Sequence, residues 1–152
     1  MKEPSQSMKY VNLTPPGALV DNASLTVAEL DTQGYDRLQV LLILGATDIA
    51  CTACELTEAD ATGTSHAEWD GSDFNGDTEV DGTTAALPSA TDDDGIFVWD
   101  VNLKNRMRFI DATITVGDGT AGGYYTVIAI LSRGTESPVG VSERGAAGYL
   151  RS

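Results

Sequence analysis

The sequence predicts an all-β fold, an antiparallel β-sandwich of jelly-roll or Greek-key type with an extended N-terminal arm. The chain has 152 residues, which suits a single domain with a sizeable core. Apolar residues make up 41% and charged residues only 21%, while Gly, Ser, Thr, Asp and Asn fill much of the rest. That mix favours strands and turns. About seven or eight short apolar segments occur with almost no helical periodicity, as in sandwiches.

The clearest strands alternate apolar and polar residues with a period of two. Residues 96–103 and 107–117 show this pattern best. The apolar faces comprise Phe97, Trp99, Val101 and Leu103 in the first segment and Ile110, Ala112, Ile114 and Val116 in the second. Each of these segments is therefore expected to bury one face and to leave the other in water.

Two further segments, residues 35–45 and 124–131, are apolar at odd and even positions alike. This pattern predicts central strands that are covered on both faces. Residues 25–30 and 49–57 are predicted as additional strands, and residues 65–69 as a short one.

The chain divides into three parts. Residues 1–23 contain three prolines and few alternating apolar positions, which predicts an extended arm in which only residues 10–13 could form a short strand. Residues 24–132 are assigned to the sandwich, and residues 133–152 to a polar C-terminal tail. We expect the arm to contact neighbouring subunits through Tyr10, Val11, Leu13, Pro15 and Pro16.

The net charge of −14 excludes several classes of partner. Nucleic acid binding requires Lys and Arg, and an acidic surface is also repelled by anionic membranes. The longest apolar run, residues 40–44, is too short for a spanning helix, and the N-terminus lacks the apolar stretch of a secretory signal. We therefore expect neither nucleic acid nor membrane as a partner, and we expect the protein to act where it is made or to leave the cell by lysis.

The two cysteines, Cys51 and Cys54, have a C-x-x-C spacing inside a predicted strand. Residues three apart on a strand point to opposite faces, so these thiols should neither form a disulfide nor share one zinc ion. His66, the one histidine, adds little to a zinc site. Buried free thiols are the expected state.

The acidic stretch at residues 70–95 raises the question of calcium. Residues 77–82 open like a calcium-binding loop between helices, but Pro88 stands where that loop requires a bidentate Glu. Two interpretations remain, a looser calcium site or a solvated acidic loop. The ligands of the looser site would be Asp70, Asp73, Asn75 and Asp77.

Catalysis has little support in the sequence. Residues 117–122 match G-x-G-x-x-G, but a strand follows them where a dinucleotide site requires a helix, so a tight β connection is the better interpretation. His66 has no recognisable nucleophile near it in the sequence. We expect neither an enzyme nor a cofactor.

Trp69 and Phe74 lie among polar residues and are candidates for exposed contacts, which leaves a carbohydrate-binding β-sandwich module as the alternative function.

Three stretches together, residues 35–48, 106–110 and 117–138, resemble small head-decoration (cement) proteins of tailed bacteriophages. The resemblance implies a β-sandwich subunit without catalytic residues, assembled in the host cytoplasm and located on the capsid exterior of the virion. It implies two partners, the major capsid protein and further copies of the chain in a homodimer or homotrimer. Its role would be to clamp neighbouring capsid subunits.

Overall fold

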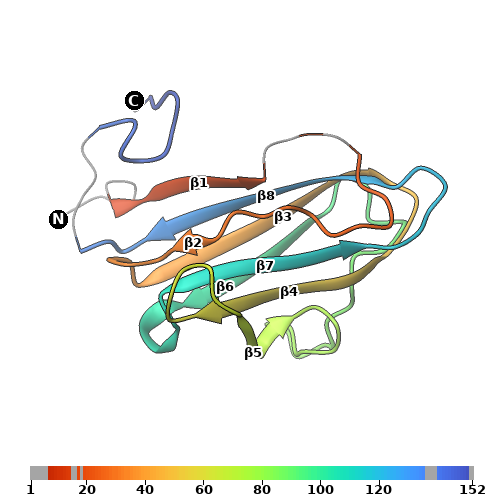
Figure 1. Cartoon of the computed structure of the whole chain (residues 1–152), viewed down its shortest axis with the longest axis horizontal. Coiled ribbons are helices and arrows are strands. Elements are labelled where there is room, and N and C mark those ends of the chain that lie inside the picture. Colours follow the sequence, from red (N-terminus) through yellow and green to blue (C-terminus); the bar gives the residue numbers. More distant parts are fainter. Residues whose placement is uncertain (1–6, 15–16, 18, 136–139, 151–152) are drawn as a thin grey trace.

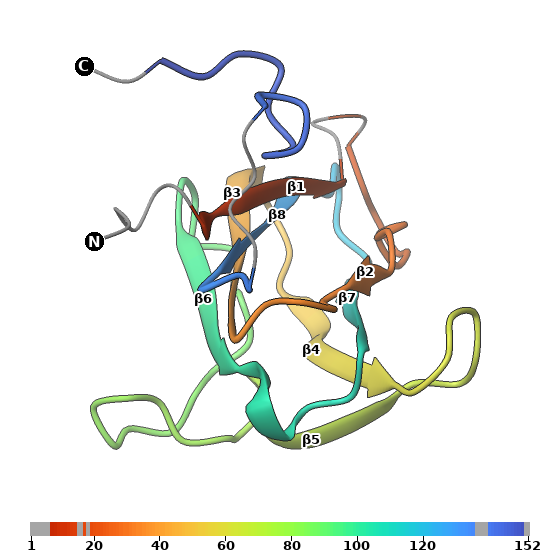
Figure 2. The same cartoon turned by 90° about the vertical axis from the view of Figure 1, so that its left-hand side faces the viewer.

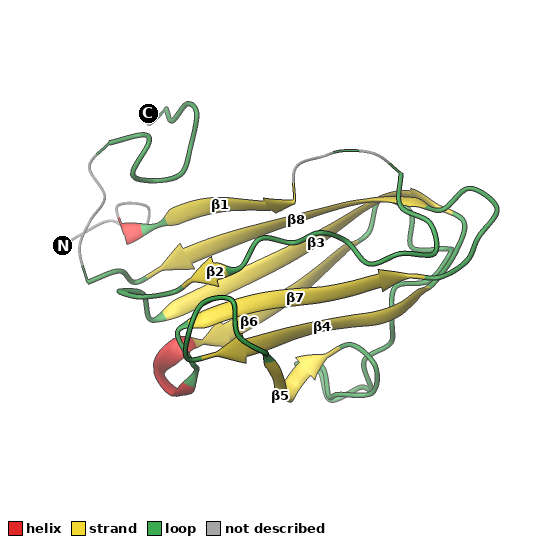
Figure 3. Ribbon diagram, in the orientation of Figure 1, coloured by secondary structure: helices red, strands yellow, loops and turns green. Residues whose placement is uncertain are grey.

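The computed structural model describes residues 7–14, 17, 19–135 and 140–150, and the regular secondary structure of these residues is almost entirely β-strand (Figures 1 and 3). Two antiparallel sheets of four strands each face one another (Figure 2). Sheet A contains, in order, β1 (Lys9–Thr14), β8 (Gly123–Ser132), β3 (Arg37–Thr47) and β6 (Ile96–Asn102). Sheet B contains β2 (Leu30–Asp31), β7 (Phe109–Val116), β4 (Cys51–Ala59) and β5 (Ala67–Asp73). A short 3-10 helix, η2 (Leu103–Asn105), follows β6.

The strand order confirms the predicted sandwich and shows which type it is. The first strand pairs with the eighth, the second with the seventh, the third with the sixth and the fourth with the fifth. This is the order of one long antiparallel hairpin that is rolled into two layers, which is the jelly-roll arrangement. Among the described residues, no helix is long and apolar enough to cross a membrane.

The core lies between the two sheets and follows the predicted alternation. On β3 and β8 the inward residues are almost completely shielded, and β6 and β7 bury the faces that the sequence predicted. The innermost side chains include Leu38, Val40, Leu42, Ile114, Val127 and Leu131. Interlocking apolar side chains from both inner faces are what holds such a sandwich together.

The prediction that β3 and β8 are covered on both faces is wrong. Their outward residues Leu41, Ile43 and Ile128 are only half-buried. Apolar neighbours on adjacent strands shield one another in part, even where the face of a sheet meets water. A second layer within this subunit therefore does not explain why the outer face of sheet A is apolar.

The N-terminal segment contributes an edge strand. Within the residues assigned to the arm, β1 pairs with β8 and buries Leu13 in the core, while Val11 packs partly against it. The Tyr10 amide donates to the carbonyl of Arg144 at 2.7 Å, which ties residues of the tail to β1. A strand this short at a sheet edge needs few alternating apolar positions, so its pattern is weak in the sequence. Pro15 and Pro16 lie outside the described residues.

The strand predicted over residues 25–30 is mostly absent, and only Leu30–Asp31 forms one. The preceding segment instead crosses the side of the sandwich by single bridges, Val20 with Gly123 and Ser24 with Thr115. The amide of Leu25 also donates to the Ile114 carbonyl at 2.9 Å. These contacts satisfy its backbone without a continuous ladder.

Both cysteines are buried and free, as expected, but they do not point to opposite faces. The register of β4 against β7 shifts between Cys51 and Ala53. Such a bulge inserts one extra residue and resets the alternation, so Cys51 and Cys54 both face the core. Burial raises the pKa of both thiols, which keeps them protonated and unreactive.

The glycine-rich residues 117–123 form a tight connection before β8, as predicted. The Asp48 carboxylate accepts hydrogen bonds from the amides of Thr120, Ala121 and Gly122 at 2.8–3.0 Å. The bond from Ala121, followed by those from Gly122 and Thr120, lowers the pKa of Asp48. The loop is therefore organised around a side chain of this chain rather than around a ligand.

Candidate functional site

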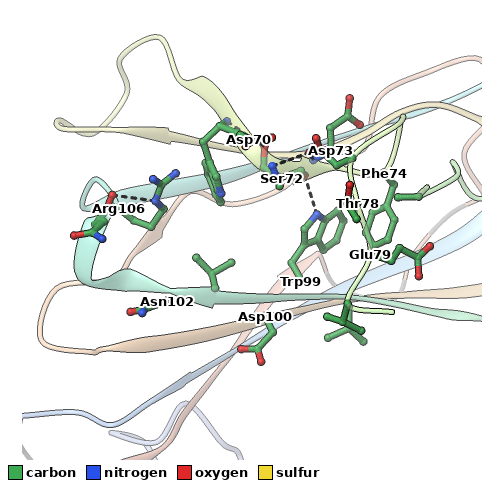
Figure 4. A pocket seen from close by; sticks show the side chains of 18 residues that line it. Asp70, Ser72, Asp73, Phe74, Thr78, Glu79, Trp99, Asp100, Asn102 and Arg106 are labelled. Carbon is green, nitrogen blue, oxygen red and sulfur yellow. Dashed lines mark hydrogen bonds between the residues drawn. The ribbon is translucent and has the colours of Figure 1, made fainter. Parts of the chain in front are cut away.

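A groove of about 430 Å³ opens between β5 and β6, the edge strands of the two sheets (Figure 4). Residues of the loop after β5, including Asp77, Thr78 and Glu79, form another part of its wall. Both rings singled out from the sequence, Trp69 and Phe74, line this groove. The two aromatic residues that the sequence analysis grouped as candidates for contacts therefore lie in the same groove.

The inner wall of the groove is held by aromatic packing. Trp99 donates from Nε1 to the Ser72 carbonyl at 2.9 Å, which links β6 to β5 across the open side of the sandwich (Figure 4). The Phe74 ring meets Phe97 and Trp99 edge to face, at centroid distances of 5.2 and 4.9 Å. Phe74 therefore packs onto the edge of the core and is not an isolated exposed ring.

Trp69 is half-buried and has a cationic neighbour. The Arg106 guanidinium lies 4.9 Å from the centroid of the Trp69 ring, and its Nη1 lies 3.3 Å from Oε1 of Glu58. The other oxygen of Glu58 accepts from the Met107 amide at 2.8 Å. One face of the Trp69 ring is thus already occupied by an arginine that a buried carboxylate holds in place.

Two of the three acidic side chains suggested for a loose calcium site, Asp73 and Asp77, serve the loop itself. Asp77 accepts from the amides of Gly71 and Asp73 at 2.9 and 2.8 Å, and Asp73 accepts from Asn75 at 2.8 Å. Short polar side chains commonly organise turns in this way. These hydrogen bonds explain why Asp stands at positions 73 and 77 without a bound ion.

A different acidic group forms on the outer face of sheet B. Within the described residues, oxygens of Glu55, Glu68 and Asp73 lie within 4.8 Å of one another. The strand register places Glu55 opposite Asp73 and Thr57 opposite Glu68. Three carboxylates in a chain with 23 acidic residues do not define a metal site by themselves, and we assign none.

This carboxylate group has a consequence for stability. Partial burial, and then the neighbouring Glu68 and Asp73, raise the pKa of Glu55. A carboxyl group whose pKa is raised on folding stabilises the folded state at low pH, and that contribution is lost as the pH rises from its ordinary value through the raised one. We therefore expect Glu55→Gln to raise the melting temperature at pH 7, with the gain shrinking toward pH 4. Thermal unfolding followed by circular dichroism across this range, with Glu79→Gln as control, measures it. An equal gain at both pH values would contradict the assignment.

His66 is used structurally. Its Nε2 lies 3.1 Å from Oε2 of Glu29, a carboxylate that also accepts hydrogen bonds from Thr62 and from the Gly63 amide. These bonds tie the loop between β4 and β5 to the segment before β2.

The predicted contact residues Tyr10, Val11 and Leu13 lie on β1, at the edge of sheet A opposite to β6.

The outer faces of the two sheets differ in character. On sheet A the outward residues of β6 are unusually exposed for apolar side chains, with Ile96 at 58% and Val98 at 47%, and Tyr124 on β8 is exposed at 49%. On sheet B the corresponding positions carry Glu55, Asp111 and threonines. A contiguous exposed apolar surface of this kind commonly marks an interaction site.

Together, the fold and these surfaces define a jelly-roll sandwich with one apolar face, one acidic face and a groove at its open edge. No protein-family model matches the sequence. No curated protein matches it either. Among solved structures the chain is similar to the SPBc2 prophage-derived protein YomS, at 12% sequence identity and a TM-score of 0.48. That comparison covers 87% of this chain and 96% of the other.

Proposed function

We propose that the chain is a structural virion protein, a capsid decoration or cement protein. In this role it associates with copies of itself on the head exterior, after assembly in the host cytoplasm, and clamps neighbouring major capsid subunits. The observation that carries the proposal is the pair of contrasting outer faces, because an apolar face and an acidic face offer contacts for two different protein surfaces. The resemblance of residues 35–48, 106–110 and 117–138 to such proteins supports it.

The acidic face suits the capsid contact. A net charge of −14 gives little affinity for DNA and matches a basic patch on a shell. Many modest contacts that are repeated by symmetry then add up to durable attachment. No step of this role needs a reaction or a cofactor.

A co-sedimentation experiment tests the proposal. Heads assembled from the major capsid protein encoded in the same genome are mixed with the purified chain, before and after head expansion. We expect binding to expanded heads that weakens as salt is raised, together with greater resistance of those heads to heat. Unchanged heads and a chain that stays in the supernatant at low salt would refute the role.

The groove favours a second candidate, a carbohydrate-binding module. Trp69 offers an aromatic surface among polar groups such as Asp70 and Asn102, as sugar sites often do. The stacked Arg106 and the packed Phe74 leave less ring surface than the sequence suggested. A glycan array with the wild-type chain and Trp69→Ala decides the matter, since a module would lose its signal in the variant. An array without signal for the wild type retires the candidate.

A further inference from the structure

The outer face of sheet A carries two adjacent rows of apolar side chains, one across three strands and one across two. The strand register aligns Val98 on β6 with Leu41 on β3 and Leu41 with Ile128 on β8. In the next row Ile96 lies beside Ile43, and the neighbour of Ile43 on β8 is the polar Thr126. Cross-strand neighbours of this kind lie close enough for their side chains to form one surface.

One end of this surface is shaped by a glycine. Gly45 lies within β3 beside Tyr124, and a Cβ atom at Gly45 would lie only 3.1 Å from that of Tyr124. A glycine inside a strand weakens it unless a neighbour approaches closely, as the tyrosine does here. The ring of Tyr124 therefore extends the apolar surface past the end of the two rows.

The same face is electrically neutral. Among the outward positions of β3, β6 and β8, the charged residues are Arg37 and Asp100, and they pair with each other at 2.6 Å. The acidic residues Glu55 and Asp111 lie on the outer face of the opposite sheet. In a chain with a net charge of −14, Asp100 is the only acidic residue at these outward positions, and Arg37 neutralises it.

This distribution indicates what covers the face. A basic partner would be attracted to the acidic side of the molecule, and a neutral apolar face offers it nothing. Two copies of a chain this acidic repel one another in most orientations. When their neutral faces meet, the two acidic faces point outward and lie on opposite sides of the pair. Two sandwiches then separate the acidic faces, and the sheets of each sandwich are about 10 Å apart. This separation exceeds the Debye length of about 8 Å, so the repulsion between the acidic faces is screened.

We propose that the outer face of sheet A is the contact between two copies of this chain, packed sheet against sheet around a twofold axis. Apolar rows that carry no unpaired charge suit a self-complementary surface, which an isologous contact requires. The exposed Ile96, Val98 and Tyr124 supply the contacts that lose water. This inference rests on the self-association in the proposed function and names the surface that performs it.

Light scattering coupled to size exclusion tests the contact. We expect the wild-type chain to have about twice the 16.0 kDa mass of one subunit. Val98→Lys should raise the dissociation constant of the pair about tenfold or more, since it places an unpaired charge within the apolar contact. Lysine also makes the chain less acidic, so weaker association cannot come from added net repulsion. Ile96→Lys, at the most exposed position of the rows, is a second variant in case the first folds poorly.

Thr113→Lys is the matched control, because it introduces the same charge at an outward strand position on sheet B. It should leave the mass unchanged. A wild-type monomer, a pair that survives both sheet A variants, or a control that dissociates as readily would overturn the proposal. Head binding is scored separately. A chain that pairs through sheet A but ignores heads refutes only the capsid role, and one that binds heads as a monomer refutes only this contact.

Discussion

Leu42→Ala is expected to cost about 2–5 kcal/mol of folding free energy, the range for deletion of a fully buried leucine side chain. Leu42 is 0% exposed and lies on β3, in the middle of the inner face of sheet A. Its neighbours on β6 and β8 are held in paired registers on both sides, so the sheet cannot close the resulting cavity easily. With total stabilities near 5–15 kcal/mol, such a loss leaves a marginal protein. Urea denaturation followed by circular dichroism measures it.

Leu41→Ala is the control for this experiment. It removes the same atoms from the adjacent residue of the same strand, but its side chain is half-buried on the outer face. We expect a loss of about 1 kcal/mol or less for a single subunit, because less apolar area leaves the protein environment. If the face pairs with a second copy, the loss should also grow with protein concentration. Equal losses for Leu41 and Leu42 at every concentration would contradict the inward and outward assignment.

Much of the sandwich could be predicted because its strands alternate. In β6 and β7 one face must be apolar and the other can be polar, so the burial of Trp99 and Ile114 follows from the period alone. The rule fails where both faces are apolar. In β3 the residues Leu41 and Ile43 suggested a second covering layer, since a sequence does not distinguish a face covered within the subunit from one that is left open for a partner.

The other failures arise from local backbone geometry. A bulge between Cys51 and Ala53 turned two residues to the same side, and no sequence signal marks such a bulge in advance. Residues 25–29 include three apolar side chains but form no strand, and the chain before them is held to the sandwich by single bridges at Val20 and Ser24. The bulge and the missing strand both depend on contacts with residues far away in the sequence, and hydrophobic periodicity carries no information about such contacts.

The groove was predictable only in part. Trp69 and Phe74 stand out as aromatic residues in polar surroundings, and both line it. Arg106 was missed, although it stacks on Trp69, because 37 positions of chain separate the two residues and only the fold joins them. The neutrality of the sheet A face was equally hidden, since Arg37 and Asp100 cancel only after β3 pairs with β6.

Gly122→Ala should destabilise the protein by about 2–5 kcal/mol. Gly122 has a φ of +84°, which costs about 1–2 kcal/mol for a residue with a side chain. A Cβ atom here would also collide with the carbonyl oxygen of Val20 and lie 2.7 Å from Cβ of Asp21. Relief of that overlap, about 1–3 kcal/mol more, requires the loop to move. Movement would break the pair of 2.9 Å hydrogen bonds between Val20 and Gly123 and pull the Gly122 amide from Asp48.

Gly82→Ala separates the two contributions. Gly82 has nearly the same φ, +88°, but no atom lies within 4 Å of its added Cβ, so only the conformational cost of about 1–2 kcal/mol applies. The difference between the variants, measured by urea denaturation, therefore isolates the close approach of residues 20–21 to the glycine-rich loop. If the two alanines cost the same, that approach contributes nothing, and the glycines of residues 117–123 serve the turn alone. A larger loss at Gly122 means that this loop also anchors residues 20–21, which the sequence analysis had assigned to the extended arm.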